Sequence, residues 1–97
     1  VLLKGHTDFI YSGADVIEIT GGSAGMTKGG TGDVLAGLVA GLYCKQSAVA
    51  TAVISSYINK KAGEVLAETV GPYFNATDLV AQVPKTLWAE YQRVELL

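Results

Sequence analysis

An acidic residue, Asp33, directly follows a loop with an unusual density of glycine. Six of the chain's twelve glycines lie between Gly21 and Gly32. Glycine loses more backbone entropy on folding than any other residue and adds no side chain to a core, so such a loop indicates bare backbone that closely approaches a ligand. An apolar helical pattern begins near Asp33, and the unpaired N–H groups of a helix's first turn favour anions. We therefore predict a phosphate-binding loop with one carboxylate beside it.

Asp33 has two interpretations that residue type leaves open. As a general base, it would take the proton from a substrate hydroxyl while that oxygen attacks a phosphoryl group. As a structural residue, it would be the N-cap of the following helix, where Asp is common. A purely structural carboxylate would be repelled by a bound phosphate, so the glycines beside Asp33 favour the catalytic role.

Neither of two familiar phosphate-binding motifs accounts for the loop. Lys28 is followed by glycine, and no Gly-Lys-Ser or Gly-Lys-Thr sequence occurs, which excludes the P-loop. The dinucleotide fingerprint is also excluded, because the residue three positions after Gly32 is Leu35. The loop must follow another template.

Four further polar residues carry weaker predictions. Lys4, at the end of an apolar run, would hold a nucleotide phosphate or lie at the rim of a sheet with its ammonium group in water. Thr7 would bond a ribose or phosphate, or merely close a turn. His6, the only histidine, is interpreted as a loop residue. Lys28 would offset phosphate charge beside the loop, or be an ordinary exposed lysine.

Short strands are predicted before the glycine loop. The continuous apolar run at Val1–Lys4 is typical of a buried strand end, and residues 8–11 and 16–19 are β-prone runs separated by the turn residues 12–15. Strands, a loop and then helices indicate an α/β layer arrangement, in which ligands bind outside the carboxyl ends of strands. We expect Lys4 and the glycine loop to face one crevice.

Long helices are predicted after the loop. Residues 33–44 are apolar nearly all round, which predicts a buried helix whose small residues pack tightly: Ala36, Gly37, Ala40 and Gly41. Ser47 is a good N-cap for a second helix over residues 48–69. Its first half is apolar and its second half carries Lys60, Lys61, Glu64 and Glu68, which predicts a helix that emerges from the core into water.

Two shorter helices are predicted at the end of the chain. Thr77 would cap a helix over residues 78–83, and Pro84 would begin a last helix. Trp88 and Tyr91 lie at helical spacing, together with Leu87 and Val94, and are interpreted as core or subunit contacts. We expect a homo-oligomer.

Composition narrows the class of protein. The net charge of −2 is spread over seven basic and nine acidic residues, which argues against nucleic acid or anionic lipid as a partner. The single cysteine, Cys44, excludes an internal disulfide framework and indicates a reducing compartment, so we expect a cytoplasmic protein. An apolar fraction of 49% and a mean hydropathy of +0.34 are high for a free-standing domain of 97 residues, so we expect another element to cover part of the chain. The sequence opens without a Met in what resembles the middle of a strand, from which we expect the C-terminal part of a larger domain.

Three segments together resemble one family. The segment Gly25-Met-Thr-Lys-Gly-Gly-Thr-Gly-Asp-Val-Leu-Ala-Gly37 is similar to the signature of the ADP- or ATP-dependent NAD(P)H-hydrate dehydratases of the ribokinase-like superfamily. Leu3-Lys-Gly-His-Thr7 and Ala76-Thr-Asp-Leu79 resemble two further segments of that family. The resemblance covers essentially residues 1–97 and implies one ribokinase-like domain of three α/β/α layers, of which this chain is about the C-terminal third.

The resemblance also implies roles for particular residues. Lys4, Gly5, His6, Thr7 and Asp8 would contact an adenine nucleotide, together with the loop residues Gly29, Gly30, Thr31 and Gly32. Asp33 would be the catalytic residue and would contact the hydrated nicotinamide cofactor. ADP or ATP would be the phosphoryl donor, with Mg²⁺ bridging its phosphates.

The chemistry implied by the resemblance agrees with the prediction from Asp33. Hydroxide is a poor leaving group, so phosphorylation of the hydroxyl of hydrated NADH or NADPH would make its elimination feasible. Two alternatives stay open, a small-molecule kinase of the same superfamily and a non-catalytic nucleotide-binding module.

Two departures from the family pattern are Asn59-Lys60-Lys61, where His-Gly-x is frequent, and Thr20–Ser23, which lacks a frequent asparagine. The first is expected to affect packing, and the second loop geometry or nucleotide preference.

Overall fold

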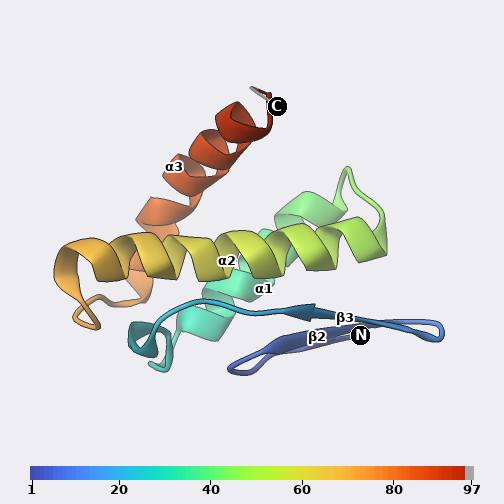
Figure 1. Ribbon diagram of the computed structural model, residues 1–97, viewed down its shortest axis with the longest axis horizontal. Coiled ribbons are helices and arrows are strands. Elements are labelled where there is room, and N and C mark those ends of the chain that lie inside the picture. Colours follow the sequence, from blue (N-terminus) through green and yellow to red (C-terminus); the bar gives the residue numbers. More distant parts are fainter. Residues whose placement is uncertain (96–97) are drawn as a thin grey trace.

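The computed structural model describes residues 1–95 as a small antiparallel sheet with three helices (Figure 1). The strands are β1 (Leu2–Leu3), β2 (Asp8–Ser12) and β3 (Asp15–Ile19), in that order across the sheet. A 3₁₀ turn, η1 (Ala24–Met26), precedes the helices α1 (Thr31–Tyr43), α2 (Ala48–Val70) and α3 (Ala76–Glu95). The predicted α/β class is confirmed, and the arrangement is consistent with part of a ribokinase-like domain.

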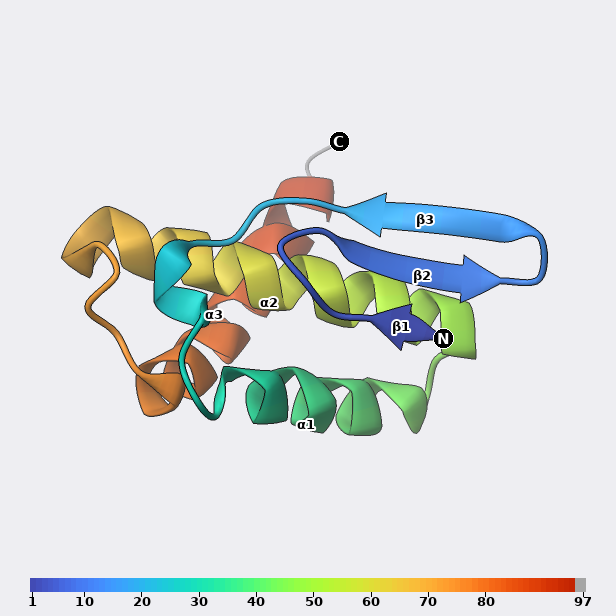
Figure 2. The ribbon, with the colours of Figure 1, turned by 90° about the horizontal axis from the view of Figure 1, so that it is seen from below.

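The predicted hairpin is formed by β2 and β3. Phe9 lies opposite Glu18 and Ile10 opposite Ile17, and β1 adds to the other edge with Leu2 opposite Ile10. Gly13 in the turn has a φ of +61°, a conformation that glycine adopts without the cost of a Cβ atom. Figure 2 shows this sheet beside α2 and α1, with the glycine-rich segment leaving β3 toward the start of α1.

Helix α2 contacts α1, α3, β2, β3 and η1. It begins after Ser47, whose hydroxyl accepts a hydrogen bond from the N–H of Ala50, so the predicted cap is confirmed. Its buried residues Ile58 and Ala62 share the core with Ile10, Leu35, Phe74 and Leu79. The core therefore lies where the middle of α2 meets β2, α1 and α3.

The prediction that α2 emerges from the core into water holds for its last turn, where residues 68–70 are exposed, but not for its middle or its start. Its most buried stretch runs from Thr51 to Gly63 and includes Lys60, which is 7% exposed, whereas Val49 near the start is 38% exposed. Lys60 is buried because the segment after β1 supplies carbonyl and carboxylate oxygens to its ammonium group. A hydropathy gradient along one helix carries no information about partners from another element.

The prediction that α1 is a buried helix is also wrong for residues 1–95. Only Thr31 and Leu35 are buried in this helix, and a Cβ atom on Gly37 or Gly41 would meet nothing within 4 Å. The helix contacts α2 and α3 along one side. Beside it lies an apolar cavity of about 320 Å³ between the sheet edge and the ends of α1 and α2. The small residues of α1 therefore have no packing partner in the described part of the chain.

The chain end is one helix rather than the two predicted. Asn75 and Asp78 exchange hydrogen bonds, each side chain accepting from the other residue's N–H, so Asn75 rather than Thr77 caps α3. Pro84 lies within this helix. Proline removes one backbone donor, which leaves the carbonyl of Val80 without its usual partner. The residue Val80 is 55% exposed, and the helix continues past Pro84 to Glu95.

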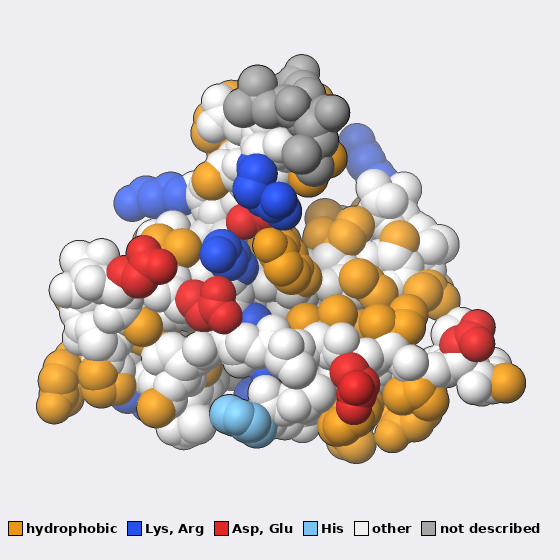
Figure 3. Space-filling view, in the orientation of Figure 1, with side chains coloured by type: hydrophobic (Ala, Val, Ile, Leu, Met, Phe, Trp, Pro, Cys, Tyr) orange, Lys and Arg blue, Asp and Glu red, His pale blue; other side chains and the backbone are white. Residues whose placement is uncertain are grey.

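The surface is mixed in character. Figure 3 shows acidic and basic side chains scattered over one face, and apolar side chains gathered over the ends of α1 and α2, where Tyr43 and Val49 are exposed. Trp88 and Tyr91 stack with ring centroids 5.9 Å apart, and both are 60% exposed, so they are not core residues within this chain. None of the helices in residues 1–95 has the combination of length and apolarity that crossing a bilayer requires.

Candidate functional site

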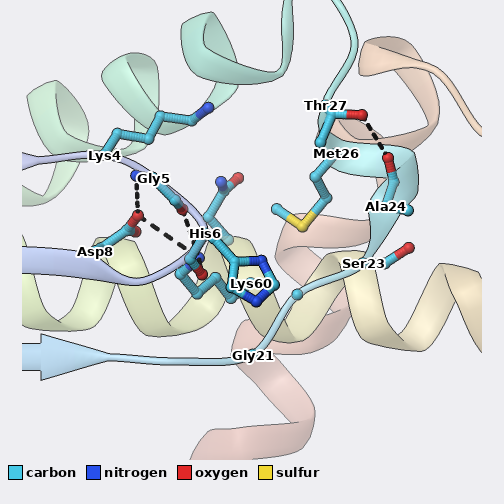
Figure 4. Close-up of a pocket in the computed structure, with 12 residues that line it drawn as sticks. Lys4, Gly5, His6, Asp8, Gly21, Ser23, Ala24, Met26, Thr27 and Lys60 are labelled. Atoms are coloured by element: carbon cyan, nitrogen blue, oxygen red, sulfur yellow. Dashed lines mark hydrogen bonds and ion pairs between the residues drawn. The ribbon is translucent and has the colours of Figure 1, made fainter.

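A pocket of about 510 Å³ lies where three separate segments meet (Figure 4). These are the turn between β1 and β2, the glycine-rich segment after β3, and one turn of α2. The residues that line it are Lys4, Gly5, His6, Asp8, Gly21, Gly22, Ser23, Ala24, Met26, Thr27, Asn59 and Lys60.

Only part of the predicted nucleotide site lines this pocket. From the segment after β1, Lys4, Gly5, His6 and Asp8 do so, whereas Thr7 does not. The second group of predicted residues, Gly29–Asp33, lies outside the pocket at the start of α1. The two groups are therefore neighbouring regions rather than one cavity.

Lys4 is the link between these two regions. It lines the pocket, and a Cβ atom on Gly32 would lie 3.9 Å from its Cε and 4.0 Å from its Nζ. The ammonium group is thus beside the last glycine of the loop. The expected single crevice is therefore found in part, because Lys4 shares the pocket with Gly21 and Gly22, whereas Gly32 lies beside Lys4 but outside the pocket.

The glycine loop enters α1 through Gly30. This residue is the N-cap with a φ of +92°, and no side chain caps the helix. Thr31 is 1% exposed, and its hydroxyl lies 2.6 Å from the carbonyl oxygen of Met26 and 2.9 Å from that of Lys28. The hydroxyl of Thr31 therefore closes the loop, and the helix start is left with an uncapped first turn.

Asp33 is the third residue of α1 and is exposed. The N-cap position belongs to Gly30, so the structural interpretation of Asp33 as the cap is wrong. An acid in the first turn still interacts favourably with the helix dipole, by about 0.3–1 kcal/mol. The carboxylate is nevertheless free to meet a ligand at the end of the glycine loop.

Lys28 does not face the anion site. Its ammonium group donates to the carbonyl oxygens of Pro72 and Phe74 and lies 5.5 Å from the centre of the Phe74 ring. Lys28 therefore fastens the loop before α3 to the glycine loop. In this position the ammonium group of Lys28 does not offset phosphate charge beside the loop.

The predicted ligand residue Asp8 is part of a buried cluster. Asp8 is 2% exposed; its Oδ1 accepts from the N–H of Gly5 at 2.9 Å and its Oδ2 from the Ser56 hydroxyl at 2.6 Å. The Nζ of Lys60 lies 3.6 Å from Oδ1 and donates to the carbonyl oxygens of Gly5 and His6 at 3.2 and 3.1 Å. Asp8 and Lys60 thus fix the backbone of the pocket's first wall.

Lys60 is the functional candidate that residue patterns missed. Its charge suggested an exposed position, although it occupies a place where the resembling family often has glycine. This departure from the family pattern is the sequence signal that points to Lys60. In the structure Lys60 is buried and organises the turn after β1, whereas the expected effect on packing relative to the family stays a prediction.

The same turn of α2 also positions the second wall of the pocket. Glu64 accepts a hydrogen bond from the N–H of Gly22 at 3.1 Å. Gly63 gives room to Met26, because a Cβ atom there would lie 2.2 Å from the Met26 sulfur. One turn of α2 therefore holds both the segment after β1 and the segment after β3.

Gly30 gives the first prediction. Gly30→Ala is unfavourable for two reasons. Gly30 has a φ of +92°, and an added Cβ atom would lie 3.0 Å from the Cβ of Ala76. We expect a loss of about 1–3 kcal/mol in the free energy of unfolding of the intact protein, measured with denaturant. Gly29→Ala is the matched control, since its added Cβ meets nothing within 4 Å. Equal losses in the two variants would contradict this account of the loop.

Comparisons with known proteins point in one direction. The family model described as NAD(P)H-hydrate dehydratase matches residues 1–85. The chain is 44% identical over 87 residues to a protein of Archaeoglobus fulgidus named bifunctional NAD(P)H-hydrate repair enzyme Nnr, which covers 90% of the chain and 19% of that protein.

Two further relatives are named ADP-dependent (S)-NAD(P)H-hydrate dehydratase. The Cenarchaeum symbiosum protein is 40% identical over 88 residues, covering 90% of the chain and 31% of the relative. The Enterococcus faecalis protein is 36% identical over 70 residues, covering 71% of the chain and 24% of the relative. The chain thus spans less than a third of the length of each of these relatives.

Proposed function

Since the chain belongs to the NAD(P)H-hydrate dehydratase family, we propose that the intact protein restores hydrated NADH or NADPH to its normal form with an adenine nucleotide as phosphoryl donor. The family resemblance predicted from the glycine loop is confirmed by the family model and by the relatives. The activity of the whole protein is a proposal, because the chain spans only part of its relatives.

One observation carries the proposal. Lys4 lines the pocket and its Nζ lies beside Gly32, at 4.0 Å from the position of an added Cβ. A nucleotide with its base and ribose in the pocket would extend its phosphates past this ammonium group to the uncapped first turn of α1. The terminal phosphate would then lie beside Asp33, two residues into that helix.

The residues are suited to a phosphoryl transfer followed by an elimination. Asp33 takes the proton of the substrate hydroxyl, whose oxygen forms a bond to the terminal phosphorus as the bond from phosphorus to the leaving nucleotide breaks. The loop N–H groups and Lys4 stabilise the negative charge on the transferring group. The lone pair of the ring nitrogen then expels phosphate from the neighbouring carbon. Loss of a proton from the next ring carbon restores the carbon–carbon double bond of NADH or NADPH.

ADP is the proposed donor, and the names of two relatives support it. Mg²⁺ is proposed on the chemistry of the donor. The described residues contain no group of three or more His, Cys, Asp or Glu side chains that could hold a metal ion. Mg²⁺ usually binds nucleotide phosphates and water with only one or two carboxylates, so the described residues are compatible with it. Asp33 is the carboxylate beside the glycine loop that would hold the ion. The ion would neutralise phosphate charge.

Location and assembly are proposals as well. A cytoplasmic location is supported by the single, free Cys44, since secreted domains of this size commonly depend on disulfides. A homo-oligomer is supported by the exposed, stacked Trp88 and Tyr91, because aromatic residues are enriched in protein interfaces.

The test of the proposed function supplies the intact protein with hydrated NADH and with ADP or ATP separately. We expect NADH absorbance to recover with ADP and not without a nucleotide. A kinase of the same superfamily would instead accumulate a stable phosphorylated product. A failure to recover NADH with either nucleotide would overturn the proposal.

A further inference from the structure

Asn59 has a buried polar atom that nothing in the described chain satisfies. The residue is 2% exposed, lies on α2 and lines the pocket. Its Oδ1 is shielded from solvent and has no hydrogen-bond partner among residues 1–95. Buried side-chain polar atoms in native proteins are nearly always hydrogen-bonded, and an unsatisfied one costs about 1–3 kcal/mol. A missing partner from outside the chain would explain the atom.

The position of Asn59 separates it from two similar residues. Thr51, Ser55 and Asn59 follow one another at four-residue intervals on α2, and all three have an unpartnered side-chain oxygen. Of these three, only Asn59 lines the pocket. A ligand in the pocket would therefore satisfy Asn59 once its carboxamide turns the oxygen toward the pocket, and it would satisfy neither of the others.

The surroundings of Asn59 suit a flat heterocycle. In Figure 4 the thioether of Met26 points into the pocket from the glycine-rich side, and the backbone of Gly21 forms part of the wall. An added Cβ atom on Gly21 would lie 2.5 Å from Oε1 of Glu64, and one on Gly22 would lie 3.1 Å from the sulfur of Met26, so glycine lets this wall approach α2 closely. Lys4 lies at the side of the pocket that leads to Gly32. A base between these walls would direct its phosphates toward the glycine loop.

We infer that Asn59 recognises the amino-bearing edge of the adenine of the donor nucleotide. A carboxamide offers one acceptor and two donors, and it pairs with adenine by accepting from the amino group while donating to a ring nitrogen. The inference rests on the proposed function, since it names the part of the donor that the pocket selects. Asn59 is a specificity-determining residue in this account, and no proton or phosphoryl group passes through it.

The test compares ADP with purine riboside 5′-diphosphate, which lacks only the amino group of adenine. Calorimetry on the intact protein measures both affinities without the hydrated cofactor. We expect the wild-type protein to bind ADP roughly 10- to 100-fold more tightly, in line with one good bidentate pair. Asn59→Leu should reduce this preference to less than about threefold, because nothing then accepts from the amino group.

Two variants complete the design. Ser55→Ala removes an unpartnered hydroxyl one turn away from the pocket, and it should keep the full preference for ADP. Asn59→Asp keeps the acceptor oxygen and the side-chain volume. This variant should bind ADP more weakly but retain the preference for ADP over purine riboside 5′-diphosphate. It therefore tests the inference even if the leucine variant misfolds. An unchanged preference in Asn59→Leu, or no preference or no ADP binding in the wild-type protein, would overturn the inference.

These outcomes are separable from those of the proposed function. A preference for ADP that depends on Asn59, without recovery of NADH, would support the base-recognition site and contradict the dehydratase activity. Recovery of NADH in a wild-type protein that does not prefer ADP over purine riboside 5′-diphosphate would support the dehydratase activity and contradict the base-recognition site.

Discussion

Asp33→Asn is expected to lower kcat for the recovery of NADH from its hydrate about 10²- to 10⁴-fold, the scale of removing a catalytic base. The amide has the shape of the carboxylate but does not take up the substrate proton. Asp33 is exposed in the first turn of α1 and is not the N-cap, so the fold should tolerate the change. Steady-state kinetics with ADP at saturation, together with the free energy of unfolding, measure the two effects separately.

Asp15→Asn is the matched control for Asp33. It removes the same charge from an exposed residue at the start of β3, in the hairpin turn and outside the pocket. We expect its kcat to stay within about twofold of wild type, as is usual for surface changes. If Asp33→Asn kept its rate within a few-fold as well, the role of general base would be excluded.

The second large effect is expected at the buried ion pair. Lys60→Met leaves Asp8 buried without its cation and the carbonyl groups of Gly5 and His6 without a donor. Breaking a buried pair by removing one partner usually costs about 3–5 kcal/mol, and we expect a loss of this size in the free energy of unfolding. In the fraction that stays folded, the turn after β1 should hold the nucleotide less firmly, which raises KM for ADP more than it lowers kcat.

The neighbouring lysine gives the control for that experiment. The Nζ of Lys61 lies 3.8 Å from the Oε2 of Glu64, and both side chains are 38% exposed. An exposed pair of this kind contributes at most about 1 kcal/mol, so Lys61→Met should have a small effect. A double variant, Asp8→Asn with Lys60→Met, should recover part of the loss, because it leaves no buried charge unpaired. Equal costs for Lys60→Met and Lys61→Met would contradict the assignment of the buried pair.

Local sequence signals predicted the secondary structure well where the cause is local. The turn residues 12–15 form the predicted hairpin, and Ser47 caps α2 as expected. The glycine loop enters a helix that begins at Thr31, two residues before its predicted start. In each case, residues within a few positions of one another determine the backbone conformation.

The errors have causes that lie far along the chain. Lys60 is buried because Asp8 and two carbonyl groups, more than fifty residues earlier, satisfy its charge. Pro84 does not end α3, which begins at the cap formed by Asn75 and Asp78 and continues through the proline to Glu95. The open face of α1 shows that apolar composition predicts burial only when a covering element is present.

The candidate site was predicted in outline. Lys4, Gly5, His6 and Asp8 line the pocket, and Lys4 connects it to the glycine loop, as the order of strands and loop suggested. The structural tasks of Asp8 and Thr31 depend on contacts that spacing does not reveal. The catalytic role of Asp33 and the nucleotide contacts of all the predicted residues, those that line the pocket included, are still predictions.

We propose that the intact protein couples nucleotide cleavage to the loss of water from a hydrated cofactor. The most direct measurement incubates the intact protein with hydrated NADH and ADP and quantifies NADH, inorganic phosphate and AMP in the same sample. We expect one phosphate and one AMP for each NADH restored, with no recovery when ADP is omitted. Restoration of NADH without consumption of a nucleotide would contradict it.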